Sequence, residues 1–342
     1  MTYNAAQLSR DYLAVALVSV VVPAFNEQQV LPAFFERLQA ALASLPDPAE
    51  VVFVDDGSSD DTPRLLDEWA AADPRVRVLH LTRNFGHQAA LTAGIDHASG
   101  DAVVLIDADL QDPPELIPAF HARWREGHQA VFGRRRRSNE GVLKRFVYHA
   151  FYKILHALAD IEIPLDSGDF SLMDRAIVDR LRQLPERTRF LRGLRSWVGL
   201  RQSAIEYDRP ARASGDSKYT LPKLFKLAFD GIVSFSAAPL RLALLLGALV
   251  SMAGFLLIGV LFYLRLAHAF ELPGWTSLMV VVLFLGGIQL LTVGIVGEYI
   301  ARIYEEVKNR PVYFVARAVG YPADALRRAP EPLRGAARSA GA

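Results

Sequence analysis

Two aspartates, Asp107 and Asp109, lie one residue apart at the end of an apolar run. The run, residues 102–106, predicts a buried strand. Open α/β folds bind ligands at the C-terminal edge of a parallel sheet. Two carboxylates there can hold a hard divalent cation, which in turn binds a diphosphate. The alternative is a structural turn, because Pro113 and Pro114 predict the start of a helix. The motif alone leaves both interpretations open.

Acidic residues also end an earlier predicted strand, residues 50–54. Asp55 and Asp56 follow it directly. Thr62 before Pro63 predicts a helix start with Thr62 as the N-cap residue. That cap accounts for Thr62 but not for the two aspartates. Acidic groups at the same edge of two strands therefore indicate a binding site rather than two chance turns.

The elements that would position these groups alternate along the chain. Strands are expected at residues 18–23, 50–54, 76–81 and 102–106, and segments of helical period at residues 28–45, 63–72 and 87–98. This alternation predicts an α/β fold, a Rossmann-like, mostly parallel sheet with helices on both faces.

The first strand leads into Pro23-Ala24-Phe25-Asn26-Glu27 and not into a phosphate-binding glycine motif. Neither G-x-G-x-x-G nor G-x-x-x-x-G-K-[ST] is found, which excludes the dinucleotide fingerprint and the P-loop. The Phe25 ring could stack on a base, and the Glu27 carboxylate could accept hydrogen bonds from a base or ribose. The alternative makes Phe25 a core residue and Asn26 the cap of the next helix.

Composition narrows the class of protein. The length of 342 residues suits two domains, and the absence of cysteine excludes disulfides and thiolate metal sites. A net charge of +1 argues against nucleic acid as a partner. Residues 1–15 form an N-terminal arm without the pattern of a signal sequence. Residues 16–218 are expected to form the soluble domain.

Hydrophobicity is concentrated in two uncharged runs, residues 242–264 and 275–297. A helix over the first run would be about 35 Å long, enough to cross a bilayer core of about 30 Å. We therefore expect a transmembrane hairpin over residues 242–300, with a buried core hairpin as the alternative. Residues 301–342 form a basic tail whose end is expected to be disordered. The tail holds eight basic residues, so the positive-inside rule predicts cytoplasmic termini and a cytoplasmic soluble domain.

Basic residues occur in three further segments, residues 134–137, 215–218 and 219–241. In residues 219–241, lysines lie between apolar residues at helical spacing, which predicts amphipathic helices in the membrane interface, with a core helix as the alternative. Arginines 134–137 follow an expected strand, and one or two of them are expected to contact phosphate. Residues 215–218 could close over a diphosphate as a lid. The alternative for residues 134–137 is a solvated charged face, and the alternative for residues 215–218 is a surface turn.

Several of these stretches together resemble the family 2 glycosyltransferases of the GT-A fold. The resemblance rests on residues 20–27, 54–58, 84–91 and 107–115. Residues 166–173, 215–218 and 234–241 narrow it to polyprenyl-phosphate glycosyltransferases with two C-terminal spans. The nearest are the bactoprenol (undecaprenyl-phosphate) glucosyltransferases, which are related to the dolichyl-phosphate mannose synthases. The resemblance covers about residues 16–315.

This resemblance implies an enzyme of the bacterial inner membrane. It would transfer a hexose, first of all glucose from UDP-glucose, to a polyprenyl phosphate for modification of cell-envelope glycans. Mg²⁺ or Mn²⁺ would be the cofactor. The alternatives are another sugar (N-acetylglucosamine, mannose or aminoarabinose) or a non-catalytic, membrane-anchored nucleotide-sugar binding module. A processive polysaccharide synthase would need a Q-x-x-R-W motif, of which Arg195-Ser196-Trp197 is the nearest remnant. Glycines in the second run favour a homo-oligomer.

The resemblance also implies roles for single residues. The donor's nucleotide and sugar would be bound by Pro23, Phe25, Glu27, Val54, Asp56, Asp107 and Ala108. The metal would be bound by Asp109 and Gln111. Acceptor and phosphate contacts would come from Arg134, Arg135, Lys144, Arg145, Ser217 and Lys218. The sequence departs from the family pattern at two positions. Phe25 stands where many members have Tyr, which removes a hydroxyl contact. Ser171 stands where members often have Arg, which removes a phosphate contact.

The chemistry of the acceptor points to the same reaction independently of the family. A lipid monophosphate has a second pKa near 6, so at pH 7 it is mostly a dianion and already a nucleophile. The harder tasks are repulsion between two phosphates and departure of the nucleoside diphosphate. We expect a single in-line displacement that inverts the anomeric carbon, with Asp109 and Arg135 in the catalytic set. Asp169 would orient the acceptor or act as a base, and the alternative role for Asp169 is a helix cap.

Overall fold

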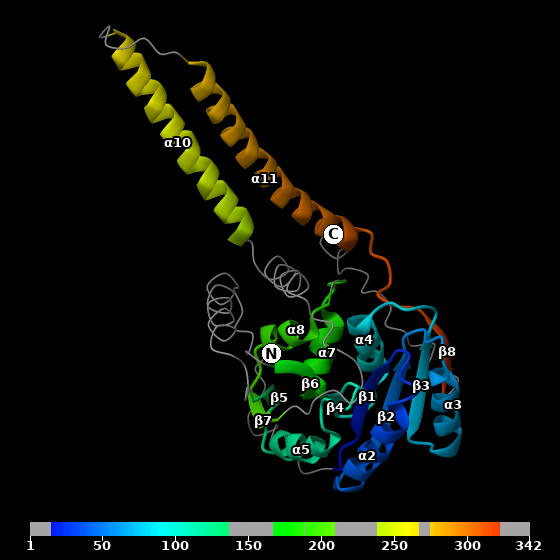
Figure 1. The fold of residues 1–342 in the computed structure, drawn as a ribbon. Coiled ribbons are helices and arrows are strands. Elements are labelled where there is room, and N and C mark those ends of the chain that lie inside the picture. Colours follow the sequence, from blue (N-terminus) through cyan, green and yellow to red (C-terminus); the bar gives the residue numbers. More distant parts are fainter. Residues whose placement is uncertain (1–14, 137–166, 188, 209–237, 267–273, 322–342) are drawn as a thin grey trace, which may run out of the picture. The chain divides into compact units, whose positions relative to one another are not determined.

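The structure is a computed structural model that describes residues 15–136, 167–187, 189–208, 238–266 and 274–321 (Figure 1). The chain divides into two compact units. One is an α/β unit that also includes the described residues after 310. The other is a helical unit whose described part comprises residues 238–266 and 274–309. The expected arm (residues 1–15) and interface helices (residues 219–241) lie largely outside the described residues.

The α/β unit is built on one eight-stranded sheet in the order β7-β5-β6-β4-β1-β2-β3-β8. The strands are β1 (Val18–Ala24), β2 (Ala49–Asp55), β3 (Val76–Leu81), β4 (Ala102–Leu105), β5 (Ala130–Arg135), β6 (Ser167–Asp174), β7 (Gln202–Tyr207) and β8 (Val315–Val319). Strands β4, β1, β2 and β3 run parallel to one another, whereas β6 and β8 run antiparallel to their neighbours. The mostly parallel sheet expected from the sequence is confirmed.

Helices cover both faces of this sheet (Figure 1). They are α2 (Leu31–Ala43), α3 (Thr62–Ala72), α4 (His87–His97), α5 (Ile117–Arg125) after a short 3₁₀ turn η1 (Pro114–Leu116), α7 (Arg175–Gln183) and α8 (Leu191–Trp197). Every residue of β1 is buried, and Val20 shares a core with Phe34 of α2. On the opposite face, a Cβ on Gly94 of α4 would lie 2.1 Å from Val21 Cγ1. A strand covered on both faces is apolar throughout, which explains the continuous hydrophobic run in β1.

One predicted helix cap is wrong. The N-cap position of α3 is Asp61, and Thr62 lies inside the helix. Asp60 Oδ1 accepts a hydrogen bond from the Thr62 N–H at 3.0 Å. The Thr62 hydroxyl oxygen instead accepts one from the Glu27 N–H at 3.0 Å. The Thr62 side chain therefore links the start of α3, after β2, to the loop after β1. This contact between distant residues could not be predicted from composition or spacing.

The predicted tail also needs correction. Helix α11 (Trp275–Val307) extends beyond residue 301, and Val315–Val319 form β8 at the edge of the sheet beside β3. The chain therefore leaves the α/β unit for the helical unit and then returns to complete the sheet. The basic composition of residues 301–342 concealed this short strand.

The helical unit is a pair of long apolar helices, α10 (Ala238–Leu266) and α11. Their large hydrophobic side chains face outward, and Leu244, Phe255 and Leu290 are each 75% exposed. A soluble protein rarely exposes such a continuous apolar surface. Among the described residues, the segment Phe284–Val307 of α11 meets the length and hydropathy expected of a membrane span, with a mean hydropathy of 1.5. The expected spans, residues 242–264 and 275–297, lie within α10 and α11.

Candidate active site

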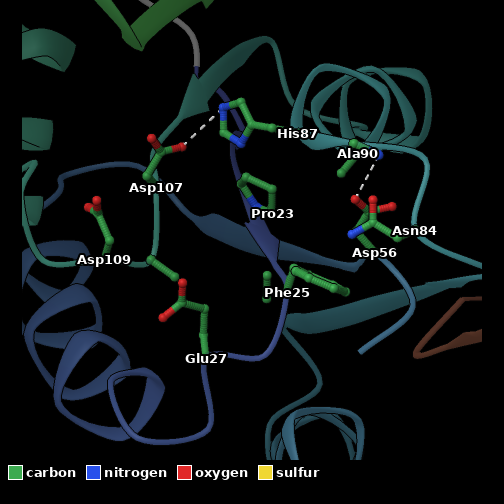
Figure 2. Close-up of a pocket in the computed structure, with 12 residues that line it drawn as sticks. Pro23, Phe25, Glu27, Asp56, Asn84, His87, Ala90, Asp107 and Asp109 are labelled. Atoms are coloured by element: carbon green, nitrogen blue, oxygen red, sulfur yellow. Dashed lines mark hydrogen bonds and ion pairs between the residues drawn. The ribbon is translucent and has the colours of Figure 1, made fainter. Parts of the chain in front are cut away.

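A cavity of about 370 Å³ opens at the C-terminal ends of β1, β2 and β4 (Figure 2). Strand β1 lies between β2 on one side and β4 on the other, which makes this edge the topological switch point of the parallel strands. The cavity is lined by Pro23, Ala24, Phe25, Glu27, Asp56, Asn84, Gly86, His87, Ala90, Asp107, Ala108 and Asp109. The structure thus brings together all the expected donor residues except Val54, which is fully buried in β2 and does not line the cavity.

The loop after β1 presents Phe25 to the cavity. The Phe25 side chain is 44% exposed, so it is not a core residue. Asn26 has a φ of +56° and does not cap a helix. Its side-chain oxygen accepts a hydrogen bond from the Ser59 N–H at 2.8 Å, and the N-cap position of α2 is Val30. The turn at Asn26 is thereby fixed between two loops, which leaves the Phe25 ring available to a planar ligand.

The two aspartates after β2 have different environments. Asp55 pairs with His80 Nδ1 at 2.8 Å and accepts a hydrogen bond from the Ser58 N–H at 2.9 Å, away from the cavity lining. Asp56 lines the cavity and accepts hydrogen bonds from the N–H groups of Phe85 and Gly86 at 2.7 and 2.9 Å. Burial raises the pKa of Asp56 above its usual value, although these two bonds act in the opposite direction. Only Asp56 is therefore placed to meet a donor.

The loop after β4 carries the two expected metal ligands, of which Asp109 lines the cavity and Gln111 does not. Leu110 has a φ of +60°, an uncommon conformation for a side chain of this size. The resulting turn lets Asp109 Oδ1 accept a hydrogen bond from the Gln111 N–H at 3.0 Å. The Gln111 side chain is 5% exposed, and its Oε1 atom has no hydrogen-bond partner in the described part of the chain.

These two residues fit a hard divalent cation. An amide oxygen and a carboxylate are ligands that Mg²⁺ accepts, and the buried Gln111 Oε1 would gain a partner. The described residues contain no group of three or more histidine, cysteine, aspartate or glutamate side chains that could hold a metal. Mg²⁺ usually binds through one or two carboxylates together with substrate phosphates and water. The small set of protein ligands therefore suits an ion that arrives with a diphosphate.

A histidine in the 84–91 stretch, to which the resemblance gave no role, joins the two acidic regions. His87, the first residue of α4, places Nε2 3.5 Å from Asp107 Oδ1 and 3.5 Å from Asp169 Oδ2. Burial acts against the charged ring, but the two carboxylates outweigh it and raise the pKa of His87 to about 9. Burial raises the pKa of Asp107 to about 6, although the His87 charge opposes this shift. At neutral pH His87 is therefore an imidazolium at the cavity wall.

Asp169 lies within β6 and is held in the ionised form. Gln88 Nε2 donates a hydrogen bond to Asp169 Oδ2 at 2.9 Å. Burial would raise the pKa of Asp169, but the hydrogen bond from His87 and the charges of Arg192 and Arg195 lower it below its usual value. Such a carboxylate is a weak base, and its contacts with His87 and Gln88 favour a positioning role. The helix-cap alternative is wrong, since Asp174 caps α7 by accepting a hydrogen bond from the Ala176 N–H at 2.8 Å.

The two expected phosphate-binding arginines that the structure describes differ in their surroundings. Neither lines the cavity, and Arg134 is exposed whereas Arg135 is partly buried. Arg135 Nη2 lies 3.7 Å from Asp112 Oδ1, and its Nε donates a hydrogen bond to the Tyr207 hydroxyl at 3.3 Å. The Tyr207 hydroxyl in turn donates to Asp112, which ties Arg135 to the acidic loop. The other expected phosphate contacts, Lys144, Arg145, Ser217 and Lys218, lie outside the described residues.

Four further residues near the acidic edge were not among the expected site residues: Asn84, Gly86, Ala90 and Arg195. Asn84, Gly86 and Ala90 join His87 in lining the cavity, and they follow β3 at the same sheet edge as the aspartates. That position is the signal that could have identified them. Arg195 of α8 is 1% exposed, and its Nε and Nη2 atoms have no hydrogen-bond partner in the part of the chain described. Burial lowers the pKa of Arg195 to about 10, and Asp169 counteracts this shift.

The charge on His87 predicts a pH dependence. The imidazolium is present below its pKa of about 9 and is lost as the pH rises through that value. Binding of an anionic ligand in the cavity should therefore weaken above pH 9. Above pH 9 we expect kcat/KM for the donor to fall in the wild-type chain and to stay constant in His87→Gln. The same fall above pH 9 in His87→Gln would assign the ionisation to another group.

Comparison with known proteins shows the family. Residues 19–182 match the model of glycosyl transferase family 2, and residues 238–303 match the GtrB C-terminal hairpin. The chain is 46% identical over 303 residues to the uncharacterized glycosyltransferase YkcC of Bacillus subtilis (88% of this chain, 94% of the relative). It is 43% identical over 302 residues to the bactoprenol glucosyl transferase of Shigella phage SfII (88% and 98%). Among solved structures, the Pyrobaculum calidifontis mannosyltransferase in complex with GDP-Man and Mn²⁺ is 20% identical, with a TM-score of 0.42 and coverage of 87% and 89%.

Proposed function

Because the chain belongs to glycosyl transferase family 2, we propose that its cavity binds a nucleotide sugar and that the enzyme transfers the sugar to a polyprenyl phosphate. UDP-glucose is the proposed donor, since relatives named bactoprenol glucosyl transferases are 43% identical over most of both chains. The observation that carries the proposal is the cavity between Asp56, Asp107 and Asp109, in a chain that also bears the hairpin. The hairpin associates the enzyme with the membrane, where the lipid acceptor resides.

Donor binding follows from the cavity lining. The Phe25 ring would stack on the uracil base, and Glu27 and Asp56 would accept hydrogen bonds from the base and ribose. Asp109 and Gln111 would hold Mg²⁺ or Mn²⁺, which supplies positive charge to the departing diphosphate. His87 adds a second positive charge at the same wall. These groups lower the repulsion between the donor's diphosphate and the incoming lipid phosphate.

Transfer would occur as a single displacement. An oxygen of the lipid phosphate attacks the anomeric carbon, and the bond from that carbon to the UDP oxygen breaks with its electron pair leaving on UDP. The acceptor is already a dianion at pH 7, so no proton has to be removed. Arg135 would position the acceptor phosphate, and the ionised Asp169 would orient His87 and Gln88. The anomeric configuration is inverted because one bond forms as the opposite one breaks.

The connectivity of the chain supports the proposed topology. Strand β7 precedes the hairpin and β8 follows it, and both belong to the same sheet. This connectivity supports the proposal that both ends of the hairpin lie on the same side of the membrane as the catalytic domain. The basic residues of the tail favour the cytoplasmic side. A homo-oligomer formed through the glycines of α11 stays a prediction.

This topology can be tested by cysteine labelling, because the natural chain contains no cysteine. In spheroplasts, a membrane-impermeant maleimide is expected to label Ala269→Cys, which lies between the two spans. Ala40→Cys, an exposed position of α2, should react only after the membrane is permeabilised. Labelling of Ala40→Cys in intact spheroplasts, with Ala269→Cys protected, would reverse the topology.

The substrate proposal is tested with a panel of donors. The purified enzyme is incubated with undecaprenyl phosphate, Mg²⁺ and one of UDP-glucose, UDP-N-acetylglucosamine or GDP-mannose, and release of nucleoside diphosphate is measured. We expect UDP release from UDP-glucose that depends on the lipid. Faster release from another donor would replace glucose by that sugar. Binding of donors without any lipid-dependent release would indicate the non-catalytic binding module instead.

A further inference from the structure

The residues that follow the hairpin are built into the catalytic domain. We call Tyr313–Tyr321 the return segment. Its strand β8 pairs antiparallel with β3, from Val78 opposite Val319 to Leu81 opposite Val315. The pairing continues one step further, because the Thr82 N–H donates a hydrogen bond to the Phe314 carbonyl at 3.0 Å. The return segment thus reaches the loop that leads from β3 into the cavity.

That loop carries part of the donor site. The Phe314 ring lies 6.3 Å from the Phe85 ring, measured between centroids. The N–H groups of Phe85 and Gly86 hold the Asp56 carboxylate, and Gly86 lines the cavity. The loop also packs tightly on the turn after β2, since a Cβ on Gly57 would lie 2.5 Å from the Arg83 carbonyl carbon. A shift of this loop would therefore disturb the Asp56 hydrogen bonds.

A second line of contacts leads from the return segment to the same turn. Arg317 forms an ion pair with Asp67 of α3 at 2.7 Å. Asp67 contacts His80 Nε2 at 3.0 Å, and His80 Nδ1 contacts Asp55 at 2.8 Å. Asp55 accepts a hydrogen bond from the Ser58 N–H. This relay ends at Asp55 and Ser58, which flank Asp56 in the turn after β2.

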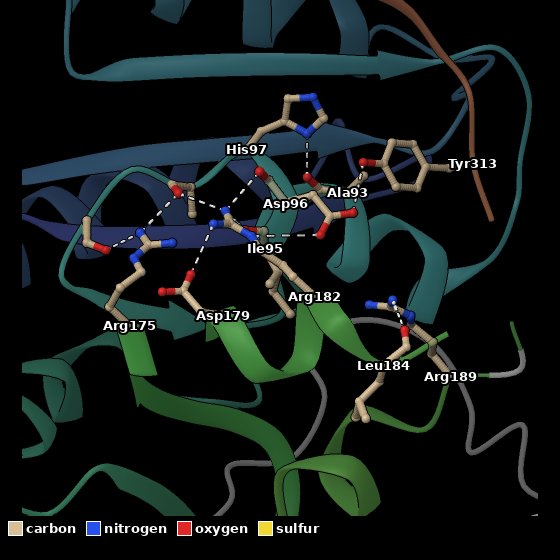
Figure 3. A network of polar contacts seen from close by, with 12 residues as sticks. Ala93, Ile95, Asp96, His97, Arg175, Asp179, Arg182, Leu184, Arg189 and Tyr313 are labelled. Atoms are coloured by element: carbon tan, nitrogen blue, oxygen red, sulfur yellow. Dashed lines mark hydrogen bonds and ion pairs between the residues drawn. The ribbon is translucent and has the colours of Figure 1, made fainter. Parts of the chain in front are cut away.

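The return segment is anchored independently at both of its ends. The Tyr313 hydroxyl donates a hydrogen bond to Asp96 Oδ2 at 3.0 Å, within a network in which Arg182 binds the carbonyls of Ile95 and Asp96 (Figure 3). At the other end, the Arg77 guanidinium lies 5.3 Å from the centre of the Tyr321 ring. Substitutions between these anchors should leave β8 in place and release only the loops that it supports.

We propose that Phe314 and Arg317 are positioning residues of the donor site and that the return segment completes this site after the hairpin. Phe314 supports the loop that donates hydrogen bonds to Asp56, and Arg317 supports the turn that carries it. The inference rests on the proposed function in so far as the ligand is a uridine nucleotide. It assigns to the post-hairpin strand a role in donor affinity that is separate from membrane attachment.

UDP affinity and amide exchange test this inference in the full-length enzyme. Arg317→Glu places a negative charge beside Asp67 and is expected to raise the Kd for UDP about fivefold, near the upper limit for an exposed ion pair. Phe314→Ala is expected to raise it by a similar factor of about five, from the loss of an aromatic pair. At saturating donor, kcat should stay within about twofold of wild type, because Phe314 and Arg317 do not line the cavity. Arg317→Lys and Phe314→Leu should restore most of the affinity.

Controls separate the inference from a general loss of stability. Arg64→Glu makes the same charge reversal on an exposed part of α3, where Arg64 pairs with Glu68 at 2.6 Å, and should leave the Kd unchanged. Hydrogen exchange of the Phe85 and Gly86 amides, measured without ligand, should become about tenfold faster in Phe314→Ala, as expected for local opening. Unchanged exchange and unchanged Kd in folded variants would overturn the inference. If the wild-type enzyme failed to bind UDP, the proposed function would fail, and the exchange rates would still decide the positioning role.

Discussion

Replacing Asp109 by alanine is expected to lower kcat for sugar transfer by about 10³-fold, the scale of losing several kcal/mol of charge stabilisation in the transition state. Asp109 lines the cavity, and Gln111, two residues later, is buried with an Oε1 atom that has no partner among the described residues. Removal of the carboxylate would leave the amide oxygen alone to hold the cation. The measurement is the rate of UDP release as Mg²⁺ and Mn²⁺ are titrated.

A matched variant distinguishes this effect from a change in net charge. Glu126→Ala removes an exposed carboxylate at the end of α5, where it pairs only with Arg123 in the described structure, and should keep wild-type kcat. In Asp109→Ala, a higher metal concentration should recover part of the activity. Metal-dependent transfer within about threefold of wild type would remove Asp109 from the metal site.

Asp169→Asn is expected to lower kcat by about 100-fold, comparable with the loss of one preorganised polar group from an active site. The amide keeps the size of the side chain and can still accept the hydrogen bond from Gln88. It removes the negative charge that faces His87 and the buried Arg195. Loss of this charge should lower the pKa of His87 and move the alkaline limb of the pH profile to lower pH.

The pH profile of this variant separates positioning from general-base catalysis. If Asp169 positions His87, the residual activity of Asp169→Asn keeps an alkaline limb, displaced downward from about pH 9. If Asp169 were the base, an acidic limb of the wild-type profile would disappear in Asp169→Asn. Turnover within about threefold of wild type would remove Asp169 from the mechanism altogether.

Much of the fold could be predicted because its signals are local. Strand β3 was expected over residues 76–81 and is observed there, because its valines and leucines form an apolar run that only Arg77 and His80 interrupt. The cavity could be anticipated as well, since parallel strands end at one edge and their aspartates follow directly. The two apolar runs of the hairpin could be identified from their length and their lack of charged residues alone.

The remaining features depend on contacts between distant parts of the chain. Strand β8 is five residues long and gains its hydrogen bonds from β3, more than 230 positions earlier in the sequence, so no local pattern marks it. Thr62 has the residue type and the position of a cap, yet its hydroxyl bonds to the Glu27 N–H. His87 owes its charge to Asp107 and Asp169, which lie on two other strand regions. Such partners become visible only when the sheet order is known.

The location of transferred label tests the central proposal most directly. Purified wild-type enzyme is incubated with UDP-[¹⁴C]glucose, undecaprenyl phosphate and Mg²⁺, and the products are partitioned between chloroform and water. The account predicts label in the chloroform phase, in a lipid that releases glucose under mild acid, and its absence when Asp109→Ala replaces the wild type. Label that stays in water or enters a long polymer would contradict it.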